Sequence, residues 1–300
     1  MALIAVNLQA VRSRIARAAQ AAHRHSGDIA LVAVSKTFPA GHIAEAFAAG
    51  QTAFGENHAQ EAVKKITVLA SLGLEWRVAQ ARQENGRARS DAIIPSAGDA
   101  SPEGPLLLPL EWRVAQARQE NSLTRSDAII PSAGVASPEG PLLLPLEWHF
   151  IGPIQSNKTR LIAECFQWVH SMDREKIAQR LNAARPDGTP PLNVLIQVNV
   201  SGEAAKSGVA PGEEAKLADA IARLPRLKLR GLMAIPEPTT DVTLQRRRFA
   251  LLRELKDGLA ARGHAFDTLS MGMSDDLEAA IMEGATMVRV GTAIFGPRTK

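Results

Sequence analysis

The chain has 300 residues, of which 45% are hydrophobic, so it can bury the core of one large barrel or of two smaller domains. Cys165 is the only cysteine, which excludes an intrachain disulfide and favours a reducing, cytoplasmic compartment. The formal charge of +4 suits a small anionic ligand as well as nucleic acid, but the densest basic run, Arg246–Arg248, is interpreted as a solvated helix face. No apolar stretch approaches the ~20 residues that cross a bilayer. We therefore expect neither nucleic-acid nor membrane binding.

The first 27 residues are rich in arginine and contain no acidic residue, a composition that resembles a transit peptide. They also carry apolar residues at helical spacing, and the chain continues directly into the first predicted strand. We therefore predict a folded N-terminal helix, whose apolar stripe consists of Leu8, Val11, Ile15 and Ala18.

Lys36 follows an apolar run, residues 29–35, that is typical of a fully buried parallel strand. It therefore lies at the carboxyl end of a strand, the edge at which α/β proteins bind ligands. A lysine that loses hydration there becomes nucleophilic enough to form a Schiff base. Alternatively, its side chain extends from the strand end into water. The lysine taken alone does not decide between the two.

A later stretch repeats itself with a period of 36 residues. Residues 74–109 and 110–145 differ at only four positions, and 146–148 begin a third copy. Folded repeats are seldom so alike, and two copies are fewer than stacked repeats normally need. We interpret residues 75–146 as an in-frame tandem duplication, partly disordered, inserted between two parts of one domain, 1–74 and 147–300. A functional binding arm is the alternative.

Outside this insert, predicted strands and helices alternate along the chain. Eight strands separated by helices are typical of a single (β/α)8 TIM barrel of the α/β class. The alternative is an open doubly wound sheet, but no Gly-x-Gly-x-x-Gly follows any strand. The insert falls in a helix-to-strand loop, away from the functional rim of a barrel. The predicted strands are 30–35, 51–54, 148–151, 167–170, 193–200, 229–233, 268–271 and 287–290, and the predicted helices are 40–49, 57–70, 157–165, 174–184, 212–223, 243–262 and 275–283.

The segments after the last two strands are typical of an anion site. Ser274 follows strand seven, and Gly291 and Thr292 follow strand eight. Glycine permits close backbone approach, hydroxyl groups donate hydrogen bonds, and barrels often hold a phosphate between these two loops. Together with a Schiff-base lysine at strand one, these residues outline a pocket for pyridoxal 5′-phosphate (PLP). Alternatively, Ser274 only caps the next helix and Gly291 only forms a turn.

Several segments resemble the pyridoxal phosphate homeostasis protein family, also called the proline synthetase co-transcribed homologues. The resemblance covers essentially everything except residues 75–146, and it implies a barrel similar to the N-terminal domain of alanine racemase, with PLP as an internal aldimine. No metal site is predicted. The segments are 33–37, 54–57, 148–158, 229–235, 270–276 and 288–296.

The resemblance also assigns roles to single residues. Lys36 would carry the aldimine, and the phosphate would contact Ser274, Gly291 and Thr292. Arg289 stands on a predicted buried strand, where a charge is costly unless paired. In similar racemases an arginine in this region faces the pyridine nitrogen and weakens the cofactor as an electron sink. Here it either contacts the ligand or pairs with a carboxylate such as that of Asp267.

Two residues after the second strand carry smaller hypotheses. Asn57 either hydrogen-bonds the cofactor or caps helix 57–70. His58 stands where the family usually has tyrosine, and we expect it on a helix surface.

Three functions are compatible with these features. The first is a protein that holds PLP without robust turnover, with no catalytic residue. The second is a PLP-dependent racemase or decarboxylase of the alanine racemase type. Such racemases use a tyrosine from a second domain, whereas this sequence contains no tyrosine and its barrel pattern runs to Lys300. The third, a phosphate-sugar barrel enzyme, leaves Lys36 and Arg289 without a shared role. We favour the first, and expect a cytoplasmic monomer that supplies PLP-dependent apoenzymes.

Overall fold

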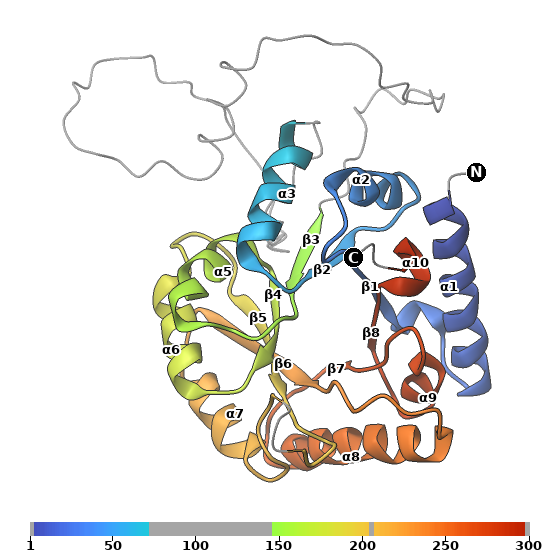
Figure 1. The fold of residues 1–300 in the computed structure, drawn as a ribbon. Helices are drawn as coiled ribbons and strands as arrows, with labels where there is room; N and C mark the ends of the chain where they lie inside the picture. Colours follow the sequence, from blue (N-terminus) through green and yellow to red (C-terminus); the bar gives the residue numbers. More distant parts are fainter. Residues whose placement is uncertain (1–2, 72–145, 204–206, 298–300) are drawn as a thin grey trace, which may run out of the picture. The chain divides into compact units, whose positions relative to one another are not determined.

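The computed structural model describes residues 3–71, 146–203 and 207–297. In this part of the chain, eight parallel strands close into a barrel, and each strand pairs with its neighbours in sequence (Figure 1). The pairing of the first strand with the eighth excludes the open doubly wound sheet, and the predicted barrel is confirmed. The strands are β1 (Ala30–Val34), β2 (Ala53–Glu56), β3 (Glu147–Phe150), β4 (Trp168–Met172), β5 (Leu192–Gln197), β6 (Leu227–Met233), β7 (Thr268–Ser270) and β8 (Met287–Val290).

Helices surround the barrel, and all seven of the predicted helices between strands are present with shifted ends. A short helix, α10, follows β8, as in barrels that bind phosphate at this position. No helix among the described residues is long and apolar enough to cross a membrane. The helices are α1 (Leu3–Ala21), α2 (Ala40–Ala48), α3 (Ala59–Ser71), α5 (Thr159–Cys165), α6 (Glu175–Ala184), α7 (Glu214–Ala222), α8 (Val242–Ala261), α9 (Leu277–Met282) and α10 (Thr292–Phe295), with 3-10 turns η1 (Ser26–Asp28) and η2 (Ser156–Lys158).

The N-terminal helix packs against the barrel, as its apolar stripe predicts. Leu8, Val11, Ile15 and Ala18 of α1 are all buried and belong to the main apolar core. A smaller cluster joins Val32, Trp168, Leu195, Met233 and Met287, one residue from each of five strands. Side chains that point into a barrel meet in this way, because neighbouring residues of a strand alternate between its inside and its outside.

The repeats were predicted to fall between a helix and the third strand. The structure confirms the flanking elements, since α3 ends at Ser71 and β3 begins at Glu147. Residues 75–145, and with them the predicted duplication, lie outside the described residues. Only its last residue, Leu146, is described, and that side chain is buried in the core.

Candidate functional site

Lys36 stands in a strained turn directly after β1. The backbone amide of Phe38 donates to the Ser35 carbonyl oxygen at 3.0 Å, which closes a four-residue turn with Lys36 second and Thr37 third. Thr37 has φ = 69°, which is the left-handed conformation. Turns with a left-handed third residue usually have glycine at that position. A β-branched residue there is a genuine outlier. Strain of this kind is characteristic of functional sites, and here it lies directly beside a half-buried lysine.

The predicted phosphate-binding residues are brought together at the same edge of the barrel. The backbone amide of Ala293, in α10, donates to the Ser274 hydroxyl at 3.4 Å, so the loop after β7 touches the first turn of α10. Gly291 and Thr292 begin that turn. A side chain at Gly291 would lie 3.1 Å from the Val34 carbonyl oxygen, so glycine permits this loop to approach the end of β1.

Ser274 does not cap the following helix, contrary to the alternative raised from the sequence. α9 begins only at Leu277, and Asp276 occupies the position before it. The Asp276 carboxylate accepts the backbone amide of Met273 at 2.6 Å, which turns the chain before the helix starts. The Ser274 hydroxyl faces α10 instead.

Arg289 is buried within the barrel on β8, with only 2% of its surface exposed. Its guanidinium donates to the Ser270 hydroxyl at 2.5 Å and to the Ala234 carbonyl oxygen at 2.9 Å. Burial lowers the pKa of Arg289 to about 10, against an opposing effect of Asp276. Asp267 pairs with Arg230 at 2.7 Å, so the alternative partner named from the sequence is wrong. Within the described residues this guanidinium has hydrogen bonds to neutral groups and no ion pair.

Asn57 directly follows β2, and its amide oxygen is buried without a hydrogen-bond partner among the described residues. It therefore does not cap α3, which begins at Ala59. Gly152, after β3, packs against its backbone: a Cβ atom on residue 152 would lie 2.2 Å from the Asn57 carbonyl oxygen. His58 is exposed, as expected, but it precedes α3 and does not lie on a helix. The Arg289 guanidinium without an ion pair fits a ligand that offers an acceptor, and the unpartnered Asn57 oxygen fits a ligand that offers a donor; PLP carries both kinds of group.

A buried charged network next to Lys36 was not predicted. The Lys65 ammonium donates to a carboxylate oxygen of Glu56 at 2.8 Å and contacts one of Glu61 at 2.6 Å. Burial raises the pKa of Glu56 more than Lys65 lowers it. Two features of the sequence could have indicated this network: a glutamate that ends an apolar strand, and a lysine on the apolar face of α3.

A second buried polar chain extends from Arg289 through the barrel. The Ser270 hydroxyl is 2.9 Å from His170 Nδ1, and His170 Nε2 is 2.9 Å from His149 Nδ1. Burial lowers the pKa of His149 to about 3. Burial first, and then the neighbouring His149 and Arg289, lowers the pKa of His170 well below its ordinary value. Both rings are therefore neutral, and they link the rim to the opposite mouth of the barrel.

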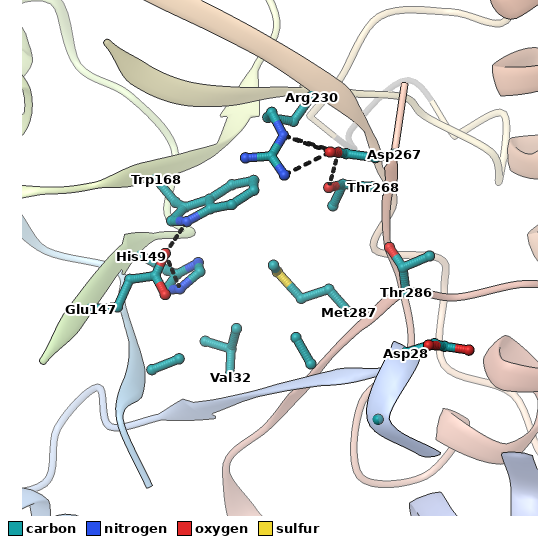
Figure 2. A pocket seen from close by; sticks show the side chains of 13 residues that line it. Asp28, Val32, Glu147, His149, Trp168, Arg230, Asp267, Thr268, Thr286 and Met287 are labelled. Carbon is teal, nitrogen blue, oxygen red and sulfur yellow. Dashed lines mark hydrogen bonds and ion pairs between the residues drawn. The ribbon is translucent and has the colours of Figure 1, made fainter. Parts of the chain in front are cut away.

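A cavity of about 360 Å³ opens at that opposite mouth (Figure 2). Its wall includes the first residues of several strands, among them Ala30, Glu147 and Trp168. Figure 2 shows Arg230 paired with Asp267 beside Trp168, and the Arg230 guanidinium lies 4.9 Å from the centre of the Trp168 ring. This cavity lies at the end of the strands opposite to Lys36 and is distinct from the predicted site.

Comparison with known proteins shows the family to which this chain belongs. The family model for the N-terminal domain of alanine racemase matches residues 6–299. Two curated relatives are named pyridoxal phosphate homeostasis protein. The protein of Pseudomonas aeruginosa is 48% identical, and the match covers 99% of this chain and 97% of the relative. The protein of Escherichia coli is 43% identical, and the match covers 98% of this chain and 97% of the relative. This chain belongs to the pyridoxal phosphate homeostasis protein family. The resemblance found in the sequence is thereby confirmed.

Solved structures of similar proteins share the fold of this family member. PipY of Synechococcus elongatus, solved with PLP bound, has a TM-score of 0.65 and 27% identity, and the match covers 98% of this chain and 100% of PipY. An alanine racemase of Clostridium difficile has a TM-score of 0.57 at 14% identity, with 99% of this chain and 57% of the racemase covered, which shows the common barrel alone.

Proposed function

We propose that this protein holds PLP as a Schiff base with Lys36 and serves intracellular PLP homeostasis without robust catalytic turnover. The observation that carries the proposal is that Lys36, in its strained turn, lies at the same rim of the barrel as Ser274, Gly291 and Thr292 beside the first turn of α10. The names of the relatives and the PLP bound to PipY support the choice of ligand.

Each residue of the rim has a role that follows from its surroundings. PLP supplies an aldehyde, which condenses with a primary amine and releases water. Lys36 would provide the amine. Ser274, Gly291 and Thr292 would receive the phosphate, because they meet at the first turn of α10 and supply two hydroxyl groups there.

Arg289 and Asn57 would bind the ring of the cofactor. The buried Arg289 guanidinium would donate to the pyridine nitrogen and keep it unprotonated, which weakens the electron withdrawal that most PLP enzymes exploit. Asn57 would accept through its buried, unpartnered amide oxygen from the 3-hydroxyl group of the ring, because the pyridine nitrogen opposite Arg289 carries no proton to donate. A site built in this way favours storage of PLP over catalysis.

A racemase or decarboxylase of the alanine racemase type is the alternative. Two-base racemisation needs a proton donor on the face opposite the lysine, and a tyrosine serves this purpose in similar racemases. The sequence contains no tyrosine. We further propose that the protein is a cytoplasmic monomer and that PLP-dependent apoenzymes receive its cofactor.

Reduction of the PLP-loaded protein with borohydride, followed by peptide mapping, tests the assignment of Lys36. The pyridoxyl group should be found on Lys36, and the visible absorption near ~420 nm should disappear on reduction. Lys36→Ala should lose both signals. A pyridoxyl group found only on another lysine, such as Lys158 in η2, would refute the assignment.

Incubation with L-alanine in deuterated water separates a carrier from a racemase. A lysine acting alone returns the α-proton to the face from which it came, so we expect slow isotope exchange and no D-alanine. Steady production of D-alanine that is lost in Lys36→Ala would identify an enzyme instead.

A further inference from the structure

We propose that Glu61 and Lys65 of α3, together with Glu56 of β2, are positioning residues that hold the turn carrying Lys36 in the geometry needed to bond PLP. This inference rests on the proposed function, because it concerns the same lysine. It adds a role for three side chains in the formation of the covalent bond.

The network binds the residues on both sides of Lys36. On the preceding side, the Ser35 hydroxyl donates to Glu56 at 2.6 Å, and the Lys65 ammonium donates to the Ser35 carbonyl oxygen at 2.8 Å. On the following side, the backbone amide of Thr37 donates to Glu61 at 2.7 Å. The backbone on either side of Lys36 is thus tied to α3, directly or through β2.

Lys65 joins the two sides of this network. Its ammonium is 2.8 Å from the Glu56 carboxylate and 2.6 Å from the Glu61 carboxylate, and its side chain is only 8% exposed. Both carboxylates use the same oxygen for the lysine and for the turn: Oε1 of Glu56 also accepts from Ser35, and Oε1 of Glu61 also accepts from Thr37. Movement of any one member would therefore displace the others.

The turn needs such support because its conformation is unfavourable by itself. Thr37 has φ = 69°, and a β-branched residue persists in this region only where its surroundings determine its conformation. The hydrogen bond from Thr37 to Glu61 is charge-assisted, a stronger type than a bond between neutral groups. Burial alone would raise the pKa of Glu61, but the bonds from Lys65 and Thr37 outweigh it, so that the pKa lies below its usual value.

The position of Lys36 matters because bond formation is sensitive to orientation. A displacement of about 1 Å can slow a reaction roughly 100-fold even when every reacting group is still present. Binding of the phosphate and ring, by contrast, depends on residues outside the network. Loss of the network should therefore impair formation of the covalent bond more than it impairs non-covalent binding.

The test compares PLP with pyridoxine 5′-phosphate, which has an alcohol in place of the aldehyde and cannot bond to an amine. For the wild type, Glu61→Ala and Lys65→Met, stopped-flow absorbance gives the rate of bond formation with PLP, and calorimetry gives the affinity for pyridoxine 5′-phosphate. We expect Glu61→Ala to slow bond formation about 10- to 100-fold while the affinity for pyridoxine 5′-phosphate changes less than about 3-fold. Glu61→Gln retains an acceptor for Thr37 and should restore most of the rate.

Lys64→Met is the matched control, because Lys64 neighbours Lys65 on α3 but is exposed. It should behave as the wild type. Glu61 is 30% exposed, so Glu61→Ala tests the inference even if Lys65→Met fails to fold. An unchanged rate in Glu61→Ala, or an equal loss of rate and of pyridoxine 5′-phosphate affinity, would overturn the inference. A wild type that does not trap PLP on Lys36 would instead refute the proposed function.

Discussion

Gly152 offers a quantitative test of how the site is assembled, because it lies against the backbone of Asn57. In Gly152→Ala, the new Cβ would lie 2.2 Å from the Asn57 carbonyl oxygen and 2.8 Å from its Cα, whereas ordinary contacts begin at 3.4 Å. A backbone cannot rotate away as a flexible side chain does, so one loop must move by roughly 1 Å. Overpacking of this kind costs about 1–3 kcal/mol.

The assay is thermal unfolding followed by circular dichroism, together with titration with PLP. At about 2–4 °C for each kcal/mol, the midpoint of Gly152→Ala should fall by several degrees. PLP should also bind more weakly, because Asn57 is displaced. Gly258→Ala is the control: it lies within α8, its new Cβ meets nothing within 4 Å, and it should stabilise by about 0.5–1 kcal/mol. A Gly152→Ala protein with the midpoint and affinity of the wild type would refute the steric argument.

Two further predictions concern pH and the insert. Because burial lowers the pKa of His149 to about 3, and that of His170 well below its ordinary value, both rings take up protons on unfolding below about pH 6.5. The free energy of unfolding is therefore at its full value above about pH 6.5 and decreases as the pH falls from there towards 3. The decrease is about 1.4 kcal/mol per pH unit for each ring. Urea unfolding at several pH values between 5 and 8 gives the free energy of unfolding as a function of pH. This free energy should depend less steeply on pH in His149→Gln than in the wild type, and an equal dependence would contradict the prediction. Deletion of residues 76–147 joins Glu75 to Trp148, and titration of this variant with PLP should give the affinity of the wild type. A variant that folds but has lost most of its affinity for PLP would mean that the insert contributes to the site.

Local patterns were sufficient to predict the architecture. The alternation of apolar strands with amphipathic helices predicts a parallel barrel, because each pattern depends on residues close together in sequence. The same patterns place Lys36 at a strand end and Leu8 on the buried face of α1, and both placements agree with the structure. The family follows from longer motifs, which the curated relatives confirm.

The partners of buried charges were decided only by the tertiary structure. Arg289 contacts Ser270 and Ala234 rather than Asp267, since the strands bring these groups together across 19 and 55 residues of sequence. The sequence left open whether Ser274 caps the next helix or faces a phosphate, whereas the structure starts α9 at Leu277 and directs the Ser274 hydroxyl to the amide of Ala293 in α10. Sequence patterns report which residues prefer to be buried. Which polar group meets which inside the barrel depends on the register of the strands and the path of the loops, which no local pattern encodes.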